Sequence, residues 1–531
     1  MTSKAAAKRI LGDLPFTADI YWLLRQSEEP PIKSFYLNKL ENALPVWIKQ
    51  VTNSDNRSQP GKRVLIFAAL HYWISHAALL GAALSGLGHN VILAYLPYAR
   101  WEEPINRFDL RRQNLYSRRV FRKANPILQA VSFLDVKELR EPPPEPVKQA
   151  VEEISLRDTQ YTSQMELIDH DSDLYRLRLA RNSKAALTAL NWMKINSPDV
   201  VIVPNGSILE MGVIYQVARY LDIPTTTYEF GEQRNRIWLA QNKEVMRQET
   251  DDLWAVCKDR PLTEDERGKV RDLFDSRQKA DLWKNFSRRW QVTPSQGGDQ
   301  VHQSLGLDAR PVVLLAANVI GDSLTLGRQF FSHNMTEWLE RTVRYFAEHS
   351  DLQLVVRIHP GERYTKGPSV AALVNQALPT IPENIHLISA DDQINTYDLL
   401  EISDLGLVYT TTVGLELAMS GIPVVIAGHT HYRDKGFTID PSSWEDYFNI
   451  LDRFAQDPQR YQLTPEQVDI SWRYAFRFFF DYPAPFPWPM PRFWKELEIW
   501  PIERVLSQEG LAQYGDTFQY LVGETRQWRI S

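Results

Sequence analysis

Cysteine is almost absent from this chain: its 531 residues include one, Cys257. A single cysteine excludes an intramolecular disulfide framework and fits a reducing compartment. The chain also lacks an apolar run that could span a membrane, because histidines, Asn90 and several glycines interrupt the longest candidate, residues 71–96. The amino terminus has no apolar core of signal-peptide length. We therefore expect a cytoplasmic protein.

There is no excess of basic residues either. The chain has 60 Lys and Arg against 66 Asp and Glu, a net charge of −6, so its overall charge gives no reason to expect nucleic-acid binding. Hydrophobic residues, by contrast, make up 44% of the sequence and aromatic residues 11%. A chain of this length and composition can bury more than one core, so we expect two domains.

Short apolar runs alternate with helical patterns in both halves of the chain, which predicts two α/β domains with parallel sheets. The expected strands of the first half are residues 64–68, 91–95, 199–203 and 225–228. Those of the second half are residues 312–316, 352–357, 385–388, 405–409 and 424–426. Right-handed crossovers through the intervening helices follow from the parallel arrangement.

Composition also suggests where the domains begin and end. We predict a helical lead-in, a first domain, a linker of helix and loop, a second domain, and a tail rich in aromatic residues and proline: residues 1–60, 61–260, 261–304, 305–470 and 471–531. The tail cannot form a spanning helix because it holds so many prolines. We expect its helix near 471–480 to pack back across the first domain, and contact with a membrane surface is the alternative.

The stretch 404–428, DLGLVYTTTVGLELAMSGIPVVIAG, predicts a strand, a tight loop, a helix and a second strand. The loop opens at the carboxyl edge of the sheet, where free helix N–H groups attract an anion. Threonine hydroxyls and the small Gly414 would let a phosphate approach, and Glu416 could accept hydrogen bonds from a sugar or ribose diol. An ordinary helix N-terminus followed by a surface glutamate fits the same pattern. The threonines are Thr410, Thr411 and Thr412.

A second polar string, Arg357-Ile358-His359-Pro360, ends the predicted strand 352–357. Arginine offers a planar fork for phosphate, and histidine offers a further donor at the same sheet edge. The exit loop of the neighbouring strand adds Asn318. Together these residues predict a phosphate clamp, although strand-end histidines also commonly cap backbone groups.

Carboxylates follow two strands of the first domain. Glu210 lies in the helix after strand 199–203, and Glu229 and Glu232 follow strand 225–228. A carboxylate that is partly desolvated in a cleft can act as a general base, so these three are candidates, and Glu229 is favoured because it stands directly at a strand end. Each of them could also be an ordinary solvated surface acid.

Two further patterns have simpler interpretations. Residues 107–123 interleave basic and aromatic side chains, which we interpret as a solvated helix face, with a site for an anionic acceptor or an inner membrane leaflet as the alternative. His429 and His431 follow strand 424–426. Because no third ligand accompanies them, we expect no metal site.

The RIHP string, the 404–428 stretch and the LGHNV segment at 87–91 resemble bacterial capsule and surface polysaccharide glycosyltransferases of the GT-B type, which have two Rossmann-like domains facing across a cleft. The resemblance extends to capsule Kdo transferases and, more distantly, to bacterial sialyltransferases and CDP-glycerol glycerophosphotransferases. It is strong over 305–450 and weak over 61–235.

The resemblance implies roles for individual residues. Arg357, His359 and the three threonines would hold the donor phosphate, Glu416 the ribose or sugar, and Glu229 would be the base, with Glu210 or Glu232 as substitutes. Threonines stand where several relatives have serines, and Glu229-Phe230-Gly231 matches the acidic base motif of the sialyltransferases only loosely.

The sequence thus predicts a glycosyltransferase that moves a sugar from a nucleotide-activated donor to a surface or lipid-linked glycan by inversion, with no metal or cofactor. Peripheral association with the inner face of the cell membrane is a further expectation. A nucleotide-sugar epimerase of the same architecture and a non-catalytic nucleotide- or glycan-binding scaffold are the alternatives.

Overall fold

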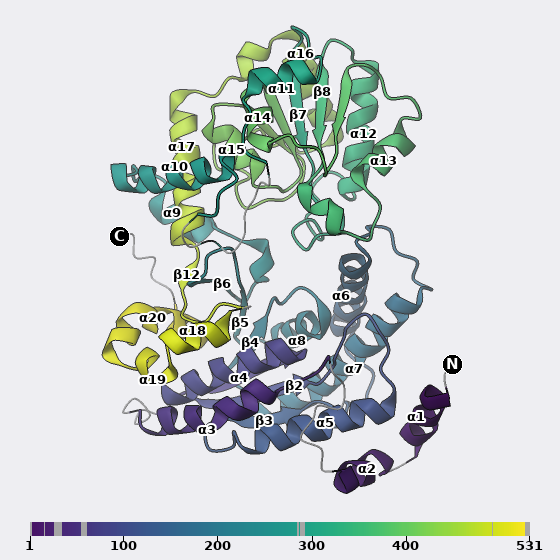
Figure 1. Ribbon diagram of the computed structural model, residues 1–531, viewed down its shortest axis with the longest axis vertical. Coiled ribbons are helices and arrows are strands. Elements are labelled where there is room, and N and C mark those ends of the chain that lie inside the picture. Colours follow the sequence, from purple (N-terminus) through teal and green to yellow (C-terminus); the bar gives the residue numbers. More distant parts are fainter. Residues whose placement is uncertain are drawn as a thin grey trace.

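The computed structural model describes residues 3–14, 16–25, 34–54, 61–283, 286, 293–490 and 492–525. It shows two α/β domains, each built around its own sheet (Figure 1). Residues of both domains line a cavity between them. The predicted fold class is confirmed. Parts of the predicted lead-in (1–2, 15, 26–33 and 55–60), linker (284–285 and 287–292) and tail (491 and 526–531) lie outside the described residues.

The first domain has a seven-stranded sheet in the order β12-β6-β5-β4-β1-β2-β3. Its strands are β1 Arg63–Ala69, β2 Asn90–Leu96, β3 Gln129–Ser132, β4 Val200–Pro204, β5 Thr225–Glu229, β6 Arg236–Gln241 and β12 Ala484–Pro485. The first five pair in parallel, whereas β6 and β12 are antiparallel to their neighbours. β1 and β2 are buried on both faces because helices cover both sides, which explains their continuous apolar sequence.

The helices of the first domain are α1 Ser3–Asp13, α2 Thr17–Arg25, α3 Asn38–Thr52, α4 His71–Gly86, α5 Arg107–Arg122, α6 Glu145–Ser163, α7 Asp173–Asn196 and α8 Leu209–Tyr220. Among them, α4 is buried along nearly its whole length. Its His76 is fully buried, and burial lowers the pKa of this imidazole to about 4. This histidine therefore belongs to the packed interior.

The second domain has a five-stranded parallel sheet in the order β11-β10-β7-β8-β9. Its strands are β7 Val312–Ala316, β8 Gln353–Arg357, β9 Ile385–Ile388, β10 Leu405–Val408 and β11 Val424–Ile426. Its helices are α11 Gly298–Ser304, α12 Met335–Glu348, α13 Val370–Ala377, α14 Thr396–Glu401, α15 Val413–Met419 and α16 Trp444–Gln456. The carboxyl ends of β7, β8 and β10 lead into loops that line the cavity between the domains.

Two helices, α9 Asp251–Cys257 and α10 Glu264–Gln278, connect the domains. α10 begins with a capping box, in which Thr263 and Glu266 satisfy each other's backbone N–H groups. Its far end carries Arg277, which is buried against α15 through an ion pair with Glu416. The connection is thus packed firmly against the second domain.

The tail crosses from one domain to the other, and one expectation about it is wrong. The helix α17, Pro465–Phe476, packs on α10 and α15 of the second domain rather than across the first. Its aromatic residues Tyr474 and Phe476 belong to the same hydrophobic core as α15. The chain then reaches the first domain as β12, followed by α18 Phe493–Ile499, α19 Ile502–Val505 and α20 Gln508–Leu521 (Figure 1).

Among the residues that the structure describes, no helix has both the length and the apolar character needed to cross a membrane.

Candidate active site

The cavity between the two domains has a volume of about 900 Å³. The first domain contributes the loops after β4 and β5, and the second contributes the loops after β7, β8, β10 and β11. Aromatic side chains such as Trp73, Trp101 and Phe230 form part of its wall. A cavity of this size, lined by both domains, can enclose a ligand that has two distinct parts.

Glu229 lies at the end of β5 and lines the cavity. Its Oε2 accepts a hydrogen bond from Asn205 Nδ2 at 3.0 Å, and its Oε1 accepts one from the N–H of Phe230 at 3.0 Å. Burial raises the pKa of this carboxyl, and the two hydrogen bonds partly oppose that change. Glu229 is therefore held in place and more basic than an ordinary surface glutamate, which are the properties of a general base.

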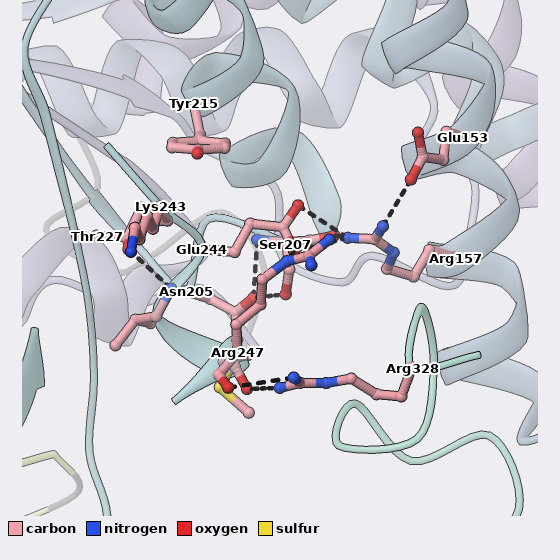
Figure 2. A network of polar contacts seen from close by, with 12 residues as sticks. Glu153, Arg157, Asn205, Ser207, Tyr215, Thr227, Lys243, Glu244, Arg247 and Arg328 are labelled. Atoms are coloured by element: carbon pink, nitrogen blue, oxygen red, sulfur yellow. Dashed lines mark hydrogen bonds and ion pairs between the residues drawn. The ribbon is translucent and has the colours of Figure 1, made fainter. Parts of the chain in front are cut away.

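The loop that carries Asn205 has an unusual backbone. Asn205 and Leu209 adopt positive φ angles of 58° and 56°. The carboxylate of Asp158, on α6, accepts a hydrogen bond from the N–H of Leu209, and Asn205 Oδ1 accepts one from the N–H of Ser207 at 3.1 Å. Figure 2 shows Asn205 and Ser207 together within the polar network of the first domain. The loop is thus held in a strained conformation that presents Asn205 to Glu229.

His359 faces the cavity from the second domain. Its Nδ1 accepts a hydrogen bond from the N–H of Gly361 at 2.9 Å, which places the proton of the neutral ring on Nε2. The ring therefore offers a donor of fixed orientation, as a phosphate ligand requires.

The loop of three threonines also lines the cavity. The hydroxyl of Thr410 is buried and has no hydrogen-bond partner among the described residues, and Asn318 Oδ1 accepts from the N–H of Thr410 at 3.2 Å. Thr411 Oγ1 accepts from the N–H of Val413 at 3.4 Å, and Thr412 caps α15 without a side-chain hydrogen bond. An unpartnered buried hydroxyl is costly, so this loop is suited to a polar ligand.

The structure contradicts the phosphate role predicted for Arg357. The guanidinium is buried, and its two Nη atoms donate to the carbonyl oxygens of Ser389 and Ile394 at 2.7 and 3.1 Å. Burial lowers its pKa to about 10. Arg357 does not line the cavity. It ties β8 to the loop after β9, because its side chain points along the sheet toward that neighbouring strand.

The ligand roles predicted for Glu416 and Gly414 are also contradicted. Glu416 is buried outside the cavity and forms an ion pair with Arg277, and burial raises the pKa of its carboxyl despite this cation. Gly414 is small for a packing reason, since a Cβ there would meet the hydroxyl of Tyr432. That hydroxyl donates to the carbonyl of Thr411. Gly414 therefore supports the shape of the threonine loop and does not contact the cavity.

The other two candidate bases differ from each other. Glu210 is buried behind the cavity wall, where its Oε1 lies 3.0 Å from Arg178 Nη2, so the carboxylate is paired and cannot serve as the base. Glu232 does line the cavity, and its Oε2 lies 3.9 Å from Arg277 Nη2. Of the three predicted carboxylates, Glu229 and Glu232 face the cavity, and Glu229 is at the strand end.

Three arginines of the cavity wall, Arg236, Arg247 and Arg328, were not predicted from the sequence. Arg328 belongs to the long loop after β7 and donates to the carbonyls of Met246 and Arg247 in the first domain (Figure 2). Burial lowers its pKa to about 10. Arg247 also lines the cavity. Arg328 lies twelve positions beyond the predicted strand 312–316, and Arg247 follows no predicted strand. None of the three belongs to a recognisable string, so the sequence carries no local signal for them.

His429 and His431 both line the cavity, and burial lowers the pKa of each. The ring of His431 stacks on Phe478, with centroids 3.7 Å apart, and its Nδ1 lies 2.9 Å from the hydroxyl of Tyr474. It is therefore part of the packing between the domain and the tail. Within the described ranges, no three His, Cys, Asp or Glu side chains gather as a metal-binding group.

One part of the chain matches a known protein family. Residues 276–460, which include most of the second domain, match the family described as capsule polysaccharide biosynthesis protein. A comparison with curated proteins gave no significant match.

Several solved structures are similar to this chain at low sequence identity and low TM-score. The beta Kdo 2,4 transferase KpsC of Thermosulfurimonas dismutans is 14% identical, with 55% of this chain and 82% of that chain covered and a TM-score of 0.33. The UDP-GlcNAc 2-epimerase of Neisseria meningitidis is 13% identical, with 79% and 98% covered and a TM-score of 0.25. The glycosyltransferase SsfS6 of Streptomyces sp. SF2575 is 12% identical, with 78% and 95% covered and a TM-score of 0.22.

The family match falls on the segment that holds the RIHP string and the threonine loop. It agrees with the resemblance predicted from those motifs: residues 276–460 are similar to the capsule polysaccharide biosynthesis family.

Proposed function

We propose that the chain transfers a sugar from a nucleotide-activated donor to a surface or capsular glycan acceptor. The observation that supports this proposal is that each domain lines one side of the cavity. Glu229, with its raised pKa, faces it from the first domain, and His359 and the threonine loop face it from the second. Glycosyl transfer needs a base on one side and phosphate ligands on the other. The single cysteine, which fits a reducing compartment, supports a cytoplasmic place for the reaction.

On the donor side, the Nε2–H of His359 and the hydroxyls of Thr410 and Thr411 are the groups that would bind the leaving phosphate. All three residues line the cavity, and the Thr410 hydroxyl lacks a partner among the described residues. A well-placed donor of this kind typically contributes about 3 kcal/mol to the stability of the transition state. Asn318 acts indirectly, because it holds the backbone of Thr410.

On the acceptor side, Glu229 would take the proton of the attacking hydroxyl. The acceptor oxygen forms a bond to the anomeric carbon as the bond from that carbon to the phosphate oxygen breaks, and the nucleotide leaves with the electron pair. One such displacement inverts the anomeric centre. The proposal assigns the leaving group's charge to side chains and amides, so a chelator is expected to leave the rate unchanged.

A panel of nucleotide sugars tests the proposal. The full chain is incubated with each donor, with and without a glycan acceptor, and the released nucleotide and the sugar products are measured. We expect one nucleotide class to raise the melting temperature and to be released faster when the acceptor is present. Conversion of the donor alone into an epimerised sugar, or nucleotide binding without any turnover on the panel, would contradict a transferase.

A further inference from the structure

Large apolar side chains stand in water along the two N-terminal helices and the turn between them. They are Ile10, Leu11, Leu14, Phe16, Ile20, Leu23 and Leu24. Phe16 is 71% exposed, Leu23 67% and Leu24 82%. We name these seven residues the N-terminal apolar surface. Large groups of exposed apolar side chains are rare on soluble proteins and usually mark a binding surface.

The exposure of α2 is one-sided. Tyr21 and Trp22 pack on α5, where the Tyr21 ring lies 5.5 Å from Phe108 between centroids. Ile20, Leu23 and Leu24 stand at positions i, i+3 and i+4, which form a single helix face. One face of α2 is therefore used within the fold, and the other is apolar and open.

Basic side chains border this surface. Residues 107–123 contain seven basic side chains and one acidic one, although the whole chain has a net charge of −6. Arg111, Arg118 and Arg122 are exposed at positions i, i+7 and i+11, so they form one stripe along α5. Arg111 also donates to the carbonyl of Leu14 at 3.0 Å, which joins the stripe to the apolar surface. Figure 1 shows α1 and α2 beside α5, away from the second domain.

We propose that the N-terminal apolar surface and the basic stripe of α5 together bind the surface of an anionic lipid bilayer. Apolar side chains of an interfacial helix enter the boundary between headgroups and acyl chains, and neighbouring Arg and Lys pair with anionic headgroups. A second copy of the chain fits less well, because a symmetric contact would bring two basic stripes together. The inference goes beyond the sugar transfer proposed for the cavity and holds whether or not that transfer occurs.

Flotation of the full chain with vesicles tests this proposal. We compare vesicles of phosphatidylcholine alone with vesicles that also contain phosphatidylglycerol, at low and high salt. The unaltered chain is expected to float with the anionic vesicles and to be released by salt. The double variant Leu23→Asp/Leu24→Asp should bind about tenfold more weakly or worse. The variant Arg111→Gln/Arg122→Gln should lose about fivefold for each charge removed.

A matched control is Ile195→Asp on α7, where the side chain is 73% exposed and lies far from the N-terminal helices in the sequence. It should bind as the unaltered chain does. All these positions are exposed, and circular dichroism will confirm that each variant is folded. Failure of the unaltered chain to bind anionic vesicles, or equal binding by the Leu23→Asp/Leu24→Asp variant, would overturn the proposal. A dimer that this same variant dissolves, seen by light scattering without lipid, would assign the surface to a second copy instead.

Discussion

Replacing Arg357 by alanine should destabilise the second domain rather than act on the donor. The guanidinium donates to the carbonyls of Ser389 and Ile394 at 2.7 and 3.1 Å and is buried. Hydrogen bonds from a charged group are worth about 1.5–3 kcal/mol each, so the loss of both should lower the free energy of unfolding by about 3–6 kcal/mol. For a domain of this size each kcal/mol lowers the melting temperature by about 2–4 °C. We therefore expect a decrease of at least about 6 °C.

The neighbouring His359 supplies the control. His359 lines the cavity, and His359→Asn keeps a side-chain acceptor for the N–H of Gly361 but removes the ring's Nε2–H. Thermal unfolding followed by tryptophan fluorescence should leave this variant within about 1 kcal/mol of the unaltered chain, while its turnover falls. If Arg357→Ala unfolds like the unaltered chain and loses turnover, then the guanidinium acts on the donor and the structural role assigned to it is wrong.

Three further predictions concern the cavity and its support. Asn205→Ala removes a hydrogen bond that favours the charged form of Glu229, so the pKa of that carboxyl should rise further. A base loses activity as the pH falls through its pKa. The pH–rate profile of the variant should therefore lose activity at a higher pH than that of the unaltered chain. Arg277→Met leaves the carboxylate of Glu416 buried without its cation and should cost about 3–5 kcal/mol in urea unfolding, and the double variant with Glu416→Leu should regain part of this. Arg328→Ala removes two hydrogen bonds to the first domain, so KM should rise more than kcat falls, and small-angle scattering should show a more open molecule.

The elements that the sequence predicted well are those whose burial is visible in the chain itself. β7, β9 and β11 have the bounds that were expected, because each is a short apolar run between polar flanks or turns. β3, β6 and β12 were not predicted. β3 is a half-polar edge strand, and β12 is two residues that pair with β6 from more than 200 positions away. Whether a segment forms an edge strand depends on the strand beside it, and a local sequence pattern does not contain that information.

The sequence predicted where the site lies in the fold, but it did not predict which partners the site residues contact. Strand ends located Glu229 and His359 at the facing edges of the two sheets, and both line the cavity. The same reasoning misplaced Glu210 and Glu416, since each is neutralised by a buried arginine from a distant helix. The sequence gives the position of a carboxylate along the chain. It does not give the cation that tertiary packing brings to it.

The most direct test of the transferase account combines two measurements on Glu229→Gln. The amide keeps the size of the side chain and can keep the contact with Asn205, but it cannot accept the acceptor's proton. The account predicts that calorimetry gives an unchanged nucleotide affinity, while sugar transfer falls by about 10² to 10⁴. Full transfer activity in this variant would contradict the account, because no proton acceptor would then be needed at the end of β5.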